Sequence, residues 1–182
     1  LLVLNEPNFY DQANMSPRQA AELWPKYEAI AQNTGVQIVG PAMNWGTIPE
    51  YGDPIIWLDE FFEEYAALND GAEPQVDYLA FHWYDYGLES QLDRLAEAYG
   101  KPFWVTEFAN WHGLWQGPDG AEIDTVEKQI QQMTEMVEVC ERRDDVFRYS
   151  WFTGRWENDS RHTSLLRGPG ELTALGRHYI SL

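Results

Sequence analysis

The sequence carries little positive charge and a single cysteine. Twelve lysine and arginine residues stand against 30 aspartate and glutamate residues, which gives a formal net charge of −18. Such a surface repels nucleic-acid phosphates and anionic membranes, and no basic stripe offsets it. Cys140 has no second cysteine to pair with, which excludes an internal disulfide but does not indicate a compartment. We therefore expect neither nucleic-acid nor membrane partners, whereas a neutral ligand is compatible with this charge.

The motifs of several protein classes are also absent. No run of about 18 apolar residues could cross a membrane, and no leader-like segment opens the chain. The sequence contains no G-x-G-x-x-G, no phosphate-binding loop and no G-x-S-x-G. Its four histidines form neither H-x-H nor H-E-x-x-H. We expect no metal site.

Aromatic residues, in contrast, are abundant. They make up 15% of the chain and include nine tryptophans. Because a buried indole N–H needs a hydrogen-bond partner, this number indicates that some tryptophans line a groove. With 182 residues, 44% of them hydrophobic, the chain is long enough for one globular domain with a sizeable core.

Five strand-like segments alternate with helical ones. Strands are predicted at residues 1–6, 36–43, 78–84, 103–108 and 146–152, and helices at about 16–34, 54–68, 88–99, 122–142 and 171–180. Cys140 lies on the apolar face of the fourth helix and is predicted to be a core thiol. The alternation predicts an α/β fold with a parallel sheet. A (β/α)8 barrel needs eight such units in about 250 residues. The chain is therefore either a barrel without its first three units or an open sheet.

Carboxylates, an amide, an imidazole and aromatic rings fall at the predicted C-terminal ends of these strands. They are Asn5, Glu6, Asn44, Trp45, His82, Tyr84, Glu107 and Trp151. In (β/α)8 enzymes this end of the strands carries the catalytic groups. Strand alternation places Leu2 and Leu4 on the same face as Glu6, and Phe103 and Val105 on the same face as Glu107.

Two glutamates on different strand ends suit glycoside hydrolysis. One protonates the leaving oxygen, while the other stays ionised and attacks the anomeric carbon. A carboxyl separation of about 5–5.5 Å predicts retention of configuration, and about 6.5–9.5 Å predicts inversion. Tryptophan and tyrosine rings beside such a pair would form flat platforms for sugar rings.

The motifs "NEPN", "FHWYD", "WVTEF" and "YSWF", followed by "SLL" and "LTALG", resemble glycoside hydrolase family 128. The resemblance runs from residue 1 to about 176, in the same order and with similar spacing. It implies a retaining (β/α)8 glycosidase with endo-β-1,3-glucanase activity and no cofactor. Residues 1–182 would then be the C-terminal part of a catalytic domain, roughly strands four to eight, with the first three βα units missing.

The same resemblance assigns roles to individual residues. Glu6 is similar to the general acid/base and Glu107 to the nucleophile. Asn5 is similar to the asparagine that contacts the sugar 2-OH, Tyr84 to the tyrosine that contacts the nucleophile, and His82 to a member of that polar cluster. Further substrate contacts are implied for Trp151 beneath the sugar and for residues in loops on the same face: Asn44, Trp45, Trp111, Trp115 and Trp156.

Two other interpretations stay open at this stage. A carbohydrate-binding protein without catalysis could use the same scaffold, although binding alone does not need both glutamates. A sugar isomerase that uses a divalent metal would also place glutamate and histidine at strand ends. The preferred partner is a β-glucan, the expected state is a monomer, and secretion is inferred from the polymeric substrate.

Overall fold

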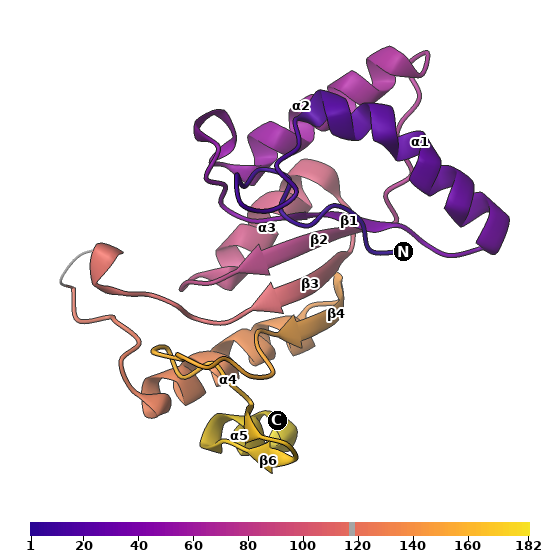
Figure 1. The fold of residues 1–182 in the computed structure, drawn as a ribbon. Helices are drawn as coiled ribbons and strands as arrows, with labels where there is room; N and C mark the ends of the chain where they lie inside the picture. The colour runs from indigo at the N-terminus through magenta and orange to yellow at the C-terminus, as the bar shows by residue number, and fades with distance from the viewer. Residues whose placement is uncertain (117–118) are drawn as a thin grey trace. The chain divides into compact units, whose positions relative to one another are not determined.

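The computed structural model describes residues 1–116 and 119–182, and it is an α/β fold (Figure 1). The elements follow in the order α1 (Pro17–Thr34), β1 (Val39–Met43), η1 (Pro49–Tyr51), α2 (Pro54–Leu68), β2 (Tyr78–Trp83), α3 (Leu88–Tyr99), β3 (Phe103–Phe108), η2 (Leu114–Gln116), α4 (Val126–Arg142), β4 (Val146–Trp151), β5 (Leu166–Gly168), β6 (Glu171–Leu172) and α5 (Ala174–Ser181). The chain divides into two compact units. The first unit is Leu1–His82 with Leu95–Trp104, and the second is Trp83–Arg94 with Val105–Leu182.

The predicted parallel sheet is present. Its four strands have the order β1-β2-β3-β4, and β1 pairs with β2 in parallel. A helix follows each of the first three strands, as a parallel sheet with crossover helices requires. Strand β3 and helices α2 and α3 have the predicted bounds. The last predicted helix begins at Ala174 rather than at about residue 171, because Glu171–Leu172 forms β6, which pairs with β5 in a small antiparallel hairpin.

The first predicted strand is interrupted. Residues 1–6 run beside β1 but form only two isolated parallel bridges, Leu2 with Val39 and Asn5 with Ala42. Leu4 and Glu6 have positive φ angles of 53° and 43°, which break the extended backbone. The predicted alternation was therefore wrong here, because Leu2 is 60% exposed whereas Glu6 is 6% exposed.

Helix α1 begins at a capping box and ends at a glycine. Ser16 accepts a hydrogen bond from the Gln19 amide while the Gln19 side chain accepts one from the Ser16 amide, which forms a capping box. Gly35 ends the helix in the left-handed conformation, with a φ of 74°. Pro25 lies inside the helix, which continues on both sides of it.

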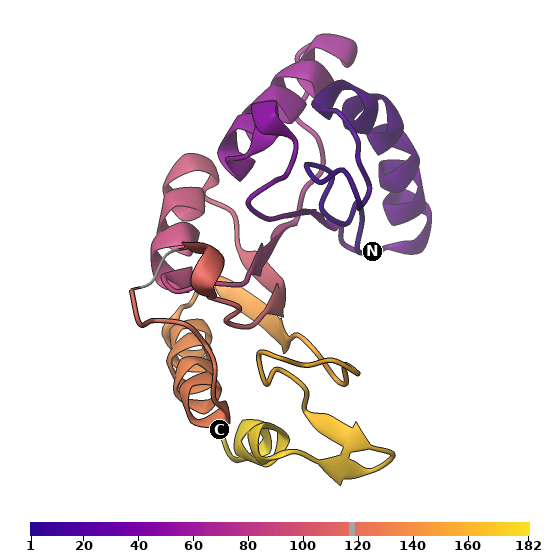
Figure 2. The same ribbon diagram turned by 60° about the vertical axis from the view of Figure 1, so that its left-hand side comes forward.

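Aromatic rings fill the core of the first unit, where α1 packs against α2 (Figure 2). Trp24, Trp57 and Phe61 have no exposed surface, and the Phe61 ring lies 4.8 Å from Trp24 and 5.5 Å from Trp57. Each indole N–H donates to a backbone carbonyl, Trp24 to Gln75 and Trp57 to Met15. These two tryptophans are therefore structural.

The core of the second unit confirms the prediction for Cys140. Helix α4 buries Met133, Val137 and Cys140 on one face. Burial raises the pKa of the Cys140 thiol to about 12, so the thiolate form is disfavoured at neutral pH. Among the described residues, no helix is both long and apolar enough to cross a membrane.

Gly176 in helix α5 gives a direct test of the packing in the second unit. A Cβ at this position would lie 2.1 Å from the Leu165 carbonyl oxygen, and the backbone cannot move aside cheaply. We expect Gly176→Ala to lower the free energy of unfolding by about 1–3 kcal/mol. Gly154→Ala is the control, because no atom lies within 4 Å of the added Cβ and the change should stay within about 0.5 kcal/mol. Equal urea midpoints for the two variants would contradict the close contact.

Candidate active site

Glu6 is a buried carboxylate with a defined hydrogen-bond environment in the first unit. It is 6% exposed, and its Oε1 lies 2.7 Å from His82 Nδ1. Asn44 Nδ2 donates to the same oxygen at 3.1 Å. Among the described residues, no group donates a hydrogen bond to Glu6 Oε2. One oxygen is therefore fixed by two partners, and the other can exchange a proton with a ligand.

The ends of β1 and β2 place these partners. Asn44 follows the last residue of β1, and His82 is the penultimate residue of β2. The Asn44 side-chain oxygen accepts the Trp45 amide at 2.8 Å, which fixes its NH2 group toward Glu6. Trp45 itself is 42% exposed. The structure thus brings three residues predicted from the sequence, Glu6, Asn44 and His82, into one hydrogen-bonded group.

Asn8 organises this group, and the sequence analysis missed it. Its side chain has no exposed surface, and its NH2 group donates to the carbonyls of Asn44 and Tyr51 at 2.8 and 3.1 Å. The backbone carbonyl of Asn8 accepts hydrogen bonds from the backbone amides of Thr47 and Ile48. A Cβ at Gly46 would lie 2.5 Å from the Asn8 carbonyl oxygen, so this loop needs glycine there. Asn8 therefore fastens residues 44–51 against the segment that carries Glu6.

Asn5 lies apart from the hydrogen-bonded group around Glu6. It is exposed, and its NH2 group donates to Gln12 Oε1 at 3.1 Å. The contact with a sugar 2-OH that the resemblance implies for Asn5 stays a prediction.

Glu107 occupies an equivalent strand-end position in the second unit. It is the penultimate residue of β3 and is partly buried, and the Tyr84 hydroxyl donates to its Oε2. Phe103 and Val105 on the same face have no exposed surface, as the predicted alternation requires. The Tyr84 ring packs against Trp111, with ring centres 4.6 Å apart. Tyr84 therefore links the carboxylate to an aromatic wall.

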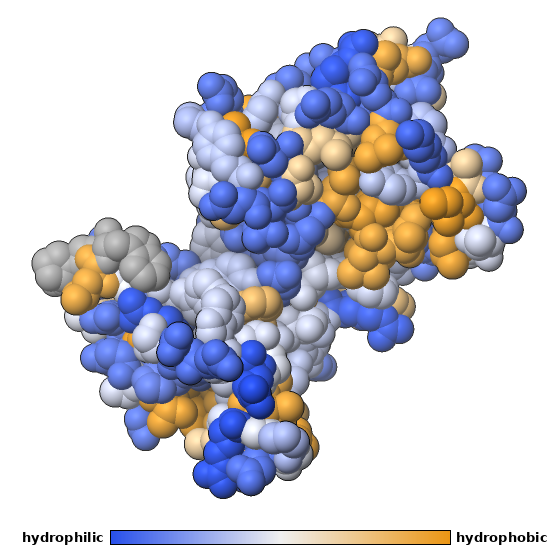
Figure 3. Space-filling model, viewed as in Figure 1, coloured by the Kyte–Doolittle hydropathy of each residue, from blue (hydrophilic) through white to orange (hydrophobic). Residues whose placement is uncertain are grey.

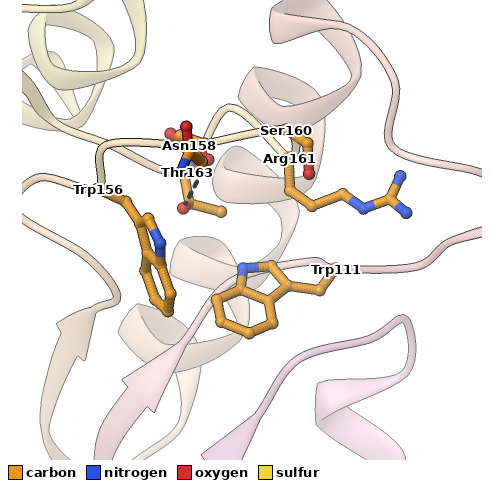
Figure 4. Close-up of a pocket in the computed structure, with 7 residues that line it drawn as sticks. Trp111, Trp156, Asn158, Ser160, Arg161 and Thr163 are labelled. Atoms are coloured by element: carbon orange, nitrogen blue, oxygen red, sulfur yellow. Dashed lines mark hydrogen bonds between the residues drawn. The ribbon is translucent and has the colours of Figure 1, made fainter.

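That wall belongs to a cavity of about 260 Å³ (Figure 4). Trp111 and Trp156 have ring centres 5.5 Å apart and nearly perpendicular planes. The two indoles lie opposite the segment 158–163, whose side chains complete the lining. Trp111 Nε1 is buried, and none of the described residues accepts its hydrogen bond. The cavity thus combines apolar ring faces with an unused donor. The Trp115 side chain lies outside the described residues.

Trp151 and Asp159 fix the segment that closes this cavity. Trp151 is 5% exposed, and its indole N–H donates to the Thr163 carbonyl at 2.9 Å. The Asp159 carboxylate accepts the amides of Thr163 and Ser164 at 2.9 and 2.6 Å. Burial raises the pKa of Asp159, but these hydrogen bonds together outweigh it and hold the pKa below its usual value.

Two histidines of the second unit also have polar partners. His112 Nδ1 lies 2.8 Å from Asp85 Oδ1, and its Nε2 lies 3.3 Å from Asp119 Oδ2. His178 Nε2 lies 2.7 Å from the Thr134 hydroxyl.

Comparisons with known proteins identify the family of this chain. A family model described as a glycosyl hydrolase catalytic core matches residues 1–179. A solved family 128 (subgroup II) endo-β-1,3-glucanase from Pseudomonas viridiflava is 63% identical, with a TM-score of 0.96, and the match covers 100% of this chain and 69% of that one. The chain belongs to glycoside hydrolase family 128. The resemblance noted from the strand-end motifs is thereby confirmed.

Two proteins of lower sequence identity also match this chain. A family 128 (subgroup I) endo-β-1,3-glucanase from Amycolatopsis mediterranei, in complex with laminarihexaose, is 27% identical with a TM-score of 0.74 over 100% of this chain and 71% of that one. Alkali-sensitive linkage protein 1 of Schizosaccharomyces pombe is 29% identical over 167 residues. That match covers 84% of this chain, which spans 29% of the length of this curated relative.

The role of Asn8 can be tested without any assay of activity. Asn8→Ala leaves the buried carbonyls of Asn44 and Tyr51 without donors, which costs about 1–3 kcal/mol. We expect faster amide hydrogen exchange in residues 44–52. Asn5→Ala is the matched control, because it removes only an exposed bond to Gln12. Unchanged exchange in the Asn8 variant would show that the loop does not depend on this side chain.

The stability of the loop that Asp159 caps should depend on pH. Its folded pKa lies below the unfolded value, so its contribution to stability is present above the unfolded pKa and is lost as the pH falls through the folded pKa. Asp159→Asn mimics the protonated form. We expect the variant to melt at a lower temperature than the wild type at pH 7 and at nearly the same temperature near pH 3. A difference that persists at the lower pH would contradict this explanation.

Proposed function

We propose that this chain is the catalytic part of a retaining endo-β-1,3-glucanase. The observation that carries the proposal is the buried Glu6 carboxylate, which has one oxygen held by His82 and Asn44 and the other left for proton exchange. The family supports the substrate class, since the Amycolatopsis relative binds laminarihexaose and the Pseudomonas relative is described as an endo-β-1,3-glucanase.

The proposed reaction has two displacements. Glu107 attacks the anomeric carbon while Glu6 gives its proton to the departing glycosidic oxygen, and a glycosyl-enzyme ester forms. Glu6 then takes a proton from water, whose oxygen attacks the same carbon and releases Glu107. The Tyr84 hydroxyl, which donates to Glu107, would orient the nucleophile.

The cavity beside Trp111 and Trp156 is the proposed site for a glucose unit. Sugar rings present flat C–H faces that pack on indoles, and their hydroxyls accept and donate hydrogen bonds. Trp111 Nε1 is a buried donor without an acceptor among the described residues, so a sugar hydroxyl would satisfy it. Asn158 and Ser160 add polar groups to the lining. Asn5, Trp45 and Trp151 are proposed as further substrate contacts.

We also infer that the complete fold is a (β/α)8 barrel, to which this chain contributes roughly strands four to eight. Apolar side chains gather around the N-terminus (Figure 3), where Leu1, Leu2 and Val36 are exposed. In the second unit, Phe147 on β4 is 54% exposed. Open sheet edges with exposed apolar groups are liabilities that barrel closure removes. Three further βα units would cover both edges.

Two further points follow from the proposed function. Residues 1–182 are proposed to be the C-terminal part of one catalytic domain that acts as a monomer, and the polymeric substrate implies secretion. The alternative is a β-glucan-binding protein without catalysis. The presence of both carboxylates favours the enzyme, because binding alone does not need a proton donor and a nucleophile.

Two substitutions test the assigned chemistry on a soluble linear β-1,3-glucan. Glu107→Gln removes the nucleophile and should abolish the release of new reducing ends. Glu6→Gln should lower the rate by about 10²–10⁴-fold, the usual contribution of a general acid. Glu138→Gln, an exposed change on α4, serves as the control with unchanged rate. The first product formed should keep the β configuration, as measured by proton NMR.

Other outcomes would redirect the assignment. Retained glucan binding without hydrolysis, in a protein extended to the full barrel, would favour the binding alternative. Hydrolysis that survives Glu107→Gln would remove this residue from the chemistry, and an α-configured first product would exclude the retaining mechanism.

A further inference from the structure

The buried side-chain amide of Gln129 has no role in the proposed reaction. Gln129, in the first turns of α4, has no exposed surface. Its NH2 group donates to the carbonyls of Asn110 and Arg161, at 2.8 and 2.6 Å. Its oxygen accepts the Asn110 amide at 3.4 Å. All three partners are backbone groups, and they belong to two separate loops.

The two loops are those that form the cavity. Asn110 precedes Trp111, whose indole is one wall, and Arg161 lies in the opposite wall (Figure 4). Gln129 therefore ties the backbone beside one wall to the backbone of the other through a single side chain. We propose that Gln129 is a positioning residue that sets the spacing of the cavity walls and thereby the affinity for glucan. The link to glucan rests on the proposed function.

The chemistry of this site requires an amide of this length. Two carbonyl oxygens and one N–H face the side chain, so the position needs two donors and one acceptor. Glutamate would place a carboxylate oxygen against the carbonyls, and methionine would leave all three groups without partners. Asparagine is one methylene shorter and cannot reach both loops from the same helix position.

The neighbouring Gln132 has a similar burial but a different connection. It is 6% exposed, its oxygen accepts the Asn110 side-chain NH2 at 2.9 Å, and its own NH2 donates to Glu135. It therefore supports the loop of Trp111 and, among the described residues, makes no hydrogen bond to the segment 156–163. The backbone of Ile123 also contacts both loops, through His112 and the Arg161 guanidinium, so loss of Gln129 need not unfold the region.

Gln129→Met and Gln132→Met form a matched pair for the test. Both replace a buried amide on the same helix with an unbranched apolar side chain, and both lose stability. For Gln129→Met we expect KM, and the Kd of a linear β-1,3-gluco-oligosaccharide measured by calorimetry, to rise on the order of tenfold, because the walls are no longer held together. The kcat value should change by less than about twofold, since Gln129 bonds to neither Glu107 nor Tyr84. For Gln132→Met we expect nearly wild-type KM and Kd.

Amide hydrogen exchange of the unliganded proteins gives a readout that does not depend on the proposed function. Gln129→Met should raise exchange in residues 109–113 and in residues 156–163, whereas Gln132→Met should raise it only in the first segment. Equal effects of the two variants on both segments, or on KM, would overturn the proposal. If the wild type neither binds nor cleaves β-1,3-glucan, the proposed function fails, while the exchange pattern still decides whether Gln129 couples the two walls.

Discussion

Loop backbones near the site depend on buried carboxamide side chains for their hydrogen bonds. Helices and strands satisfy their own N–H and C=O groups, but a loop that is buried beside a site cannot. In the first unit Asn8 supplies donors to the carbonyls of Asn44 and Tyr51. In the second unit Gln129 supplies donors to the carbonyls of Asn110 and Arg161. Each amide fixes a loop that carries residues of the candidate site, so the geometry of the site depends on groups that no substrate would touch.

A second constraint acts on the segment that carries Glu6. Leu4 and Glu6 have left-handed φ angles, which cost free energy in residues with a side chain. The backbone bonds between residues 1–6 and β1 hold this conformation, including the Glu6 amide to the Ala42 carbonyl at 2.9 Å. The irregular backbone buries Glu6 while Leu2 stays exposed, which a regular strand would not do. The irregular backbone at Leu4 and Glu6 brings the Glu6 carboxylate within hydrogen-bonding distance of His82.

The sequence predicted most of the regular structure, because the local signals agreed with the tertiary packing. The capping box at Ser16 and the apolar stripe with Cys140 are examples. It also placed Glu6, Asn44 and His82 near the ends of neighbouring strands, and these three side chains form one hydrogen-bonded group in the structure. The break at Leu4 could not be predicted, because no glycine marks the left-handed residues. Asn8 and Gln129 were missed because their role depends on loop carbonyls whose positions only the folded chain reveals. The second asparagine of "NEPN", inside a turn motif, was the one available signal.

Each of the two glutamates has a hydrogen-bond partner that bears on its proposed role. His82 Nδ1 can donate to Glu6 Oε1 or accept a proton from it, depending on the tautomer and protonation state of the ring. Such a partner tolerates both the protonated and the ionised carboxyl group, as a residue that alternates between acid and base requires. The Tyr84 hydroxyl donates to Glu107 Oε2 and thereby orients the carboxylate. A nucleophile must approach the anomeric carbon in a defined direction, so a fixed orientation suits the role proposed for Glu107. The neighbours of the two residues are therefore compatible with the roles that the family implies.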